Sequence, residues 1–169
     1  MRRARDSPHD HRSRDEPTLD EVWHHARVAS KWGMTPRQSI EAMCARRGRD
    51  DVIAGCVGLL EGRTVDDELI LTLGGPHARR VLDGFEGGRE GYWPRVWAVR
   101  GLLHVFDAVA TDAVIRAGTD DSWRVREMVA KVVAAHRVDE AAEAVAGLLD
   151  DPVARIRCAA ERALTRLVG

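Results

Sequence analysis

Residues 122–128 of the chain read SWRVREM, and a similar arrangement of residue types returns at residues 152–158, which read PVARIRC. A third version, WPRVWAV, occupies residues 93–99. One arginine aligns in the three segments, at intervals of 29 and 31 residues: Arg95, Arg124 and Arg155. Self-similarity at a nearly fixed period is the sequence signature of a repeat architecture. These segments therefore predict repeats of about thirty residues.

The stretches between these segments repeat as well. Asp107 and Asp139 are 32 positions apart, and each precedes an alanine-rich stretch, as an acidic residue at a helix N-terminus does. Each repeat is therefore expected to be a hairpin of two helices. The second helices would begin their buried stripes with aliphatic residues: Val96, Val125 and Ile156. Extrapolation by the same period predicts an earlier pair at about 65–73 and 76–83, preceded by a helix at 51–61.

The composition favours helices that pack closely on one another. Of the 169 residues 44% are hydrophobic but only 5% are aromatic, so the core is built from small aliphatic side chains and an all-α fold is predicted. The net charge of -1 provides no global field to attract nucleic acid or an anionic membrane. No apolar run reaches the length of a membrane span. The excess of arginine over lysine indicates a bacterial genome of high GC content.

The chain is expected to form one domain that follows an N-terminal tail. Residues 1–16 mix arginine with aspartate and have no apolar spacing, which predicts a disordered tail; a basic arm that contacts nucleic acid is the alternative. Residues 17–169 are predicted to be a single helical domain. Its cap helices fall within 18–47, the second beginning with a capping box at Thr35, and its repeats span 51–167.

Two consecutive repeats share a set of residues: Asp121, Val125 and Arg126 in one, and Asp151, Pro152, Ile156 and Arg157 in the next. By these residues the chain resembles the HEAT-repeat family, in its short bacterial, lyase-type form of about thirty residues per repeat. The resemblance implies a short right-handed α-solenoid of HEAT-like helical hairpins with an N-terminal helical cap. It also implies a hydrogen-bonded ladder between repeats: Asp121, Arg126, Asp151 and Arg157. Trp97 stands at the arginine position of the earlier segment, so the ladder is expected to end there.

Cations gather on the second helices of the predicted hairpins, and five of them form a candidate basic face: Arg95, Arg124, Lys131, Arg155 and Arg162. Arg124 and Lys131 are seven positions apart and share a helical face, and a second such pair follows 31 residues later. Stacked repeats would join the two pairs into a patch that binds an anion. The structural alternative is that Glu127 pairs with Lys131 and that arginine stems cover apolar edges.

Aromatic residues cluster at the starts of two of these helices, and they are the candidate anchors of an interface: Tyr92, Trp93, Trp97 and Trp123. Exposed tryptophans contribute binding energy at protein interfaces and stack on nucleic-acid bases. In a chain with few aromatics, the same residues could instead fill the core between repeats, and this interpretation is favoured.

The sequence offers no catalytic constellation, metal site or cofactor motif. His24 and His25 are adjacent, so on a helix they point about 100° apart and cannot chelate one ion together. The cysteines are odd in number and have no CxxC spacing, which favours a reducing cytoplasm over a disulfide framework: Cys44, Cys56 and Cys158.

These observations favour a non-enzymatic interaction or scaffold module that holds a protein partner on its second-helix face. The alternative is nucleic-acid binding, because the combination of tryptophan and arginine distantly resembles the HEAT-like DNA glycosylases, which hold duplex DNA against a basic face. Those enzymes place a catalytic acid beside the tryptophans, and here only Glu127 stands there. An enzyme of another class is left open, since a fold alone does not exclude one.

Overall fold

The computed structural model describes residues 33–169. The predicted tail, the first cap helix and the pair His24 and His25 lie outside these residues. All regular secondary structure in the described part is helical, so the prediction of an all-α fold is confirmed. None of the helices between residues 33 and 169 is long and apolar enough to cross a membrane.

Nine α-helices are found in the described part of the chain: α2 (Pro36–Arg47), α3 (Arg49–Leu60), α4 (Asp67–Gly74), α5 (Ala78–Leu82), α6 (Tyr92–His104), α7 (Thr111–Ala117), α8 (Trp123–His136), α9 (Ala142–Gly147) and α10 (Ala154–Val168). Short 3₁₀ segments join several of them: η1 (Gly75–His77), η2 (Phe85–Glu90), η3 (Ala108–Ala110), η4 (Asp139–Ala141) and η5 (Leu148–Asp150).

The capping box predicted at Thr35 is confirmed. The Thr35 side chain accepts a hydrogen bond from the backbone N–H of Gln38, and the Gln38 side chain accepts one from the backbone N–H of Thr35. These bonds satisfy two of the donors that a helix N-terminus leaves unpaired. The helix ends at Gly48, whose φ of 93° suits a residue without a side chain.

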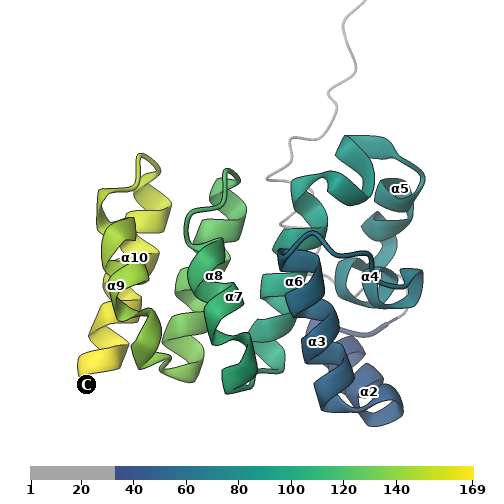
Figure 1. Ribbon diagram of the computed structural model, residues 1–169, viewed down its shortest axis with the longest axis horizontal. Coiled ribbons are helices and arrows are strands. Elements are labelled where there is room, and N and C mark those ends of the chain that lie inside the picture. The colour runs from purple at the N-terminus through teal and green to yellow at the C-terminus, as the bar shows by residue number, and fades with distance from the viewer. Residues whose placement is uncertain (1–32) are drawn as a thin grey trace, which may run out of the picture.

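Helices α6, α8 and α10 form the central row of the molecule. Helix α8 packs between α6 and α10, and Figure 1 shows the three helices following one another along the long axis. The shorter helices α7 and α9 pack beside this row: α7 contacts α8 and α3, and α9 contacts α8 and α10. The described part of the chain therefore ends in two consecutive helix pairs, α7 with α8 and α9 with α10.

The partner of α6 differs from the sequence prediction. The extrapolated pair at 65–73 and 76–83 put the helix before α6 at 76–83, but that segment forms only η1 and the five-residue α5. Helix α3 occupies the expected position instead, because it packs against both α6 and α7. Gly84 and Gly87, with φ angles of 92° and 87°, keep the segment between α5 and α6 from continuing as a helix.

The contact between α3 and α6 is close because a glycine lies in it. A Cβ atom on Gly101, in the middle of α6, would lie 2.8 Å from the Cys56 sulfur of α3 and 2.7 Å from a Leu73 methyl of α4. Any side chain at this position would push the three helices apart.

The structure also corrects the register of the repeats. Helices α6, α8 and α10 begin at intervals of 31 residues: Tyr92, Trp123 and Ala154. The same interval relates three rows of buried positions: Pro94, Val125 and Ile156; Ala98, Val129 and Ala160; Gly101, Val132 and Ala163. Arg95 is therefore equivalent to Arg126, and its alignment with Arg124 in the sequence analysis is wrong by two residues.

Candidate interaction surface

Two ion pairs connect the row of helices to the loops between them. Arg95 of α6 donates to the Asp120 carboxylate, with an N–O distance of 2.6 Å, and Arg126 of α8 donates to the Asp151 carboxylate at 2.7 Å. The two pairs are 31 residues apart, in the register of the helices. Each carboxylate also accepts a backbone N–H two residues later, from Ser122 and Val153. The pairs therefore fix equivalent turns in two consecutive repeats.

The predicted ladder is thus partly wrong. Asp120, not Asp121, is the equivalent of Asp151, and Asp121 contributes only its carbonyl oxygen, which accepts a hydrogen bond from Arg126. The ladder does not end at Trp97, because Arg95 takes the arginine position there. Arg157 behaves as its place in the register suggests, donating to the carbonyl oxygens of Asp151 and Pro152.

Arg95 is left out of the basic face, because it stands in the register of Arg126 and Arg157 and its guanidinium pairs with Asp120. The other four predicted cations stand in the 31-residue register, and Arg100, which the sequence analysis left out, extends one of their rows to α6. We call these five residues the cationic surface: Arg100, Arg124, Lys131, Arg155 and Arg162. Arg100, Lys131 and Arg162 occupy one helix position, while Arg124 and Arg155 occupy another that lies two turns earlier.

Glu127 is a carboxylate within this surface. It is 7% exposed, and its Oε1 atom lies 2.7 Å from Lys131 Nζ and 2.9 Å from Arg155 Nε. The structural alternative for Lys131 is therefore realised in part, because its charge is shared with Glu127. The surface nevertheless counts five cations and this one carboxylate, and only Lys131 and Arg155 contact Glu127, so it carries an excess of positive charge. Glu161, the other acidic residue of α6, α8 and α10, is exposed on α10 and shares the register position of Ala130, not that of Glu127.

The four candidate aromatic anchors divide into a buried pair and a surface pair. Trp93 and Trp97 are 3% and 2% exposed, and their rings stack with centroids 6.0 Å apart. A Cβ atom on Gly74 would lie 2.7 Å from the Trp97 ring, so this indole fills the space that the glycine leaves. Tyr92 and Trp123 are only partly buried. Trp93 and Trp97 are thus core residues in this structure and are not presented to a partner.

Arg124 joins the aromatic cluster to the cationic surface. Its Cζ atom lies 4.3 Å from the centroid of the Trp123 ring and 5.7 and 5.9 Å from those of Trp93 and Tyr92. Contacts of this kind attract a guanidinium to the ring face and fix its orientation. The Arg124 Nε atom is buried and has no hydrogen-bond partner among the described residues. Arg124 is therefore held by aromatic rings and not by a carboxylate.

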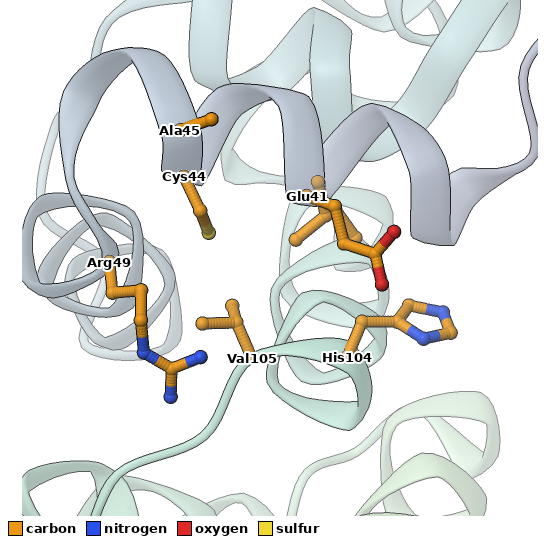
Figure 2. A pocket seen from close by; sticks show the side chains of 7 residues that line it. Glu41, Cys44, Ala45, Arg49, His104 and Val105 are labelled. Atoms are coloured by element: carbon orange, nitrogen blue, oxygen red, sulfur yellow. The ribbon is translucent and has the colours of Figure 1, made fainter.

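A separate pocket of about 340 Å³ lies between α2, the start of α3 and the end of α6. It is lined by the following residues: Ile40, Glu41, Cys44, Ala45, Arg49, His104 and Val105. Figure 2 shows the Cys44 sulfur directed into the pocket on the side of Arg49, and the His104 ring on the other side beyond Val105. The thiol and the imidazole are not arranged as a nucleophile and its base, which must lie within hydrogen-bond reach.

The pKa shifts of Cys44 and His104 also argue against a reactive cysteine in this pocket. Burial raises the pKa of the Cys44 thiol, an effect that the nearby Arg49 opposes only in part. Burial, followed by the charge of Arg100, lowers the pKa of His104. A neutral thiol and a neutral imidazole thus face the pocket at neutral pH, whereas a reactive cysteine needs its thiolate. In the region from 33 to 169, no group of three His, Cys, Asp or Glu residues could hold a metal ion.

The three thiols should differ in their rate of alkylation. In native protein treated with iodoacetamide at mildly alkaline pH, we expect exposed Cys158 to react first and Cys44 more slowly. Cys56 is 0% exposed and burial raises its pKa to about 12, so it should react only on unfolding. Mass spectrometry of timed samples measures the three rates, and denatured protein is the control in which all three should react alike. Faster modification of Cys44 than of Cys158 would contradict the neutral thiol described above.

Comparisons of the chain with protein-family models, with curated proteins and with solved structures found no match.

Proposed function

We propose that the chain is a non-enzymatic HEAT-repeat scaffold, a short right-handed α-solenoid, that binds an acidic protein partner on its cationic surface. The helix pairs α7 with α8 and α9 with α10, related by a 31-residue register, support the solenoid. The Arg–Asp pairs at equivalent turns support the resemblance to HEAT repeats. A reducing cytoplasm belongs to the proposal, and it is supported by three cysteines that form no disulfide.

The observation that carries the proposed function is the set of cations on α6, α8 and α10. Each of the three helices contributes at least one cation in register, and Glu127 is the carboxylate among them. Arg124 is held on the faces of aromatic rings, and no carboxylate of the described segment pairs with it that a partner would have to displace. Charge of one sign on a surface attracts a partner of the other sign and selects its orientation.

A nucleic acid is the second candidate, and the contact between Arg124 and Trp123 is what favours it. Aromatic and guanidinium planes at a surface are the groups on which unpaired bases stack. The net charge of -1 works against it, because nucleic-acid affinity comes largely from released counterions.

Neutralising two cations should test the proposed surface while Glu127 keeps its ion pair with Arg155. We expect Lys131→Gln combined with Arg162→Gln to weaken binding of fluorescent poly-L-glutamate by about tenfold, measured by anisotropy near physiological salt. Glutamine keeps the chain length and most of the packing while it removes the charge. Reversal to glutamate would be less informative at Lys131 and Arg155, since it would place new carboxylates beside Glu127.

The matched control is Arg79→Gln combined with Arg80→Gln. It removes the same charge from α5, which lies at the other end of the molecule from α10 (Figure 1). Equal loss in both double variants would show that only net charge matters and would contradict the proposed surface. Tighter binding of a single-stranded oligonucleotide, with a log–log salt slope of about -0.7 per phosphate contacted, would favour the nucleic-acid alternative.

A further inference from the structure

The cationic surface contains a row with one cation from each of three successive helices. Arg100 of α6, Lys131 of α8 and Arg162 of α10 are separated by 31 residues, so they occupy the same position on their helices. Helices in contact have axes about 8–10 Å apart. Because α8 packs against both neighbours, the three backbone positions of the row follow one another across the helices at about that spacing.

Arg100, the first member of this row, pairs with no carboxylate among residues 33–169. It donates a hydrogen bond to the backbone carbonyl of Leu73, and its Nε atom is buried without a partner among the described residues. Burial lowers the pKa of its guanidinium to about 10, and no neighbouring acid raises it. A partly buried cation of this kind gains more from an incoming carboxylate than a fully solvated one does.

The other two members of the row are closer to solvent. Arg162 is exposed on α10, and the Lys131 side chain is 39% exposed while it pairs with Glu127 at 2.7 Å. Glu127 is at the register position of Val96 on α6 and of Cys158 on α10, so no carboxylate repeats beside Arg100 or Arg162. The row therefore offers two cations without an acidic neighbour in register and a central one that is half neutralised.

The spacing selects among peptide conformations. A polyproline II segment advances about 3.1 Å per residue with three residues per turn, so every third side chain lies on one side at intervals of about 9.3 Å. A β-strand presents side chains to one face at about 6.6 Å intervals or at twice that distance, which matches the row poorly. An α-helix reaches a similar distance only with residues seven apart, at about 10.5 Å.

We propose that the row of Arg100, Lys131 and Arg162 binds a polyproline II segment of a partner protein that carries an acidic residue at every third position. The segment crosses α6, α8 and α10 in turn, with one carboxylate at each cation. This inference rests on the proposed function, because it names the ligand of the same surface. It adds a periodicity and a conformation that attraction between charges alone does not require.

Peptides that differ only in the order of their residues distinguish attraction between charges from recognition of an acidic residue at every third position. The first peptide is (Glu-Pro-Pro)n with four repeats, and the second has the same composition with its four glutamates in one block. Anisotropy with the full chain near physiological salt should show the first binding about tenfold more tightly. The variant that combines Lys131→Gln with Arg162→Gln should lose this preference, while the variant that combines Arg79→Gln with Arg80→Gln should keep it.

Each other result overturns the inference in a distinguishable way. Equal affinity for the two peptides, with equal loss in the Lys131 and Arg162 variant, would refute the periodic segment and leave the proposed function standing. Binding of neither peptide would refute the inference, and if poly-L-glutamate also failed to bind, the proposed function would fall with it. Preference for a peptide with glutamate at every seventh position in an alanine-rich helix would replace the polyproline segment with a helical one. Thermal unfolding curves of both variants establish that they are folded.

Discussion

The substitution Val125→Asp is expected to unfold the helix pairs that follow α6. Val125 is 0% exposed in α8, the helix that packs between α6 and α10, so the new carboxylate would be surrounded by apolar groups. Burial of an unpaired charge costs several kcal/mol, and the whole stability of a domain is about 5–15 kcal/mol. The equivalent change Ile156→Asp in α10 should act in the same way, since Ile156 is also 0% exposed. Circular dichroism during heating would show reduced helicity and a lost or much earlier transition.

Val109→Asp is the matched control for these two substitutions. Val109 is 74% exposed in η3, so the same change in side chain adds a solvated charge and should shift the melting temperature little. Full helicity and an unchanged transition in both Val125→Asp and Ile156→Asp would contradict the 31-residue register. The comparison with Val109 separates burial of the charge from its mere addition to the chain.

The helical class and the later helices could be predicted from the sequence because they rest on local signals. Capping at Thr35 and the apolar stripes that begin at Val125 and at Ile156 are properties of single helices, and the structure contains them. The register was less secure, because tryptophan and arginine at positions 93–97 resemble those at positions 122–126 in more than one alignment. Only the contacts between helices distinguish an offset of 29 residues from one of 31.

The repeat period of the sequence could not predict that α3 is the helix that packs against α6. Helix α3 and α6 are separated by α4, α5 and η2, so their contact joins segments that no fixed period relates. One signal was present in the sequence, namely a glycine in the middle of a strongly helical segment. Gly101 indicates close approach of another helix, although it does not say which one.

The candidate site was predicted in its residue types and missed in its details. Four of the five predicted cations fall on the cationic surface. Arg95 does not, because it pairs with Asp120, which lies 25 residues later in the loop after α7 and shows no local pattern with it in the sequence. Arg100 was left out of the predicted basic face because the offset of 29 residues between Arg95 and Arg124 places it opposite Val129 and not opposite Lys131. The tryptophans differ in exposure because Gly74, far away in sequence, leaves room for Trp97.

The second large effect is expected when the ladder carboxylate Asp151 is removed. Its side chain is 4% exposed and that of Arg126 is 15% exposed, and their 2.7 Å contact holds the turn before α10 to α8. Asp151→Ala would leave the Arg126 guanidinium without its carboxylate and the backbone N–H of Val153 without its acceptor. Breaking one partner of such a pair costs about 3–5 kcal/mol. Chemical denaturation at neutral pH should therefore show a large loss of stability.

Asp121→Ala is the control, because Asp121 is the exposed neighbour that the HEAT resemblance assigned to the ladder. Its carboxylate makes no ion pair within the described residues, so its removal should change stability by less than about 0.5 kcal/mol. Equal losses at Asp121 and Asp151 would restore the ladder that the sequence suggested and refute the one in the structure.

The loss of stability caused by Asp151→Ala should become smaller in acid, because protonation of Asp151 removes the ion pair from the wild type as well. The hydrogen bond from Arg126 lowers the pKa of Asp151 in the folded protein, and a second bond from Val153 acts in the same sense. A carboxyl whose folded pKa is depressed contributes stability above its unfolded pKa of about 3.9, and loses it as pH falls toward the folded value. The stability difference between the wild type and Asp151→Ala should therefore be largest at neutral pH and narrow below about pH 4. A difference that stayed constant as the pH fell from about 4 toward the folded pKa of Asp151 would mean that Asp151 acts through packing and not through its charge.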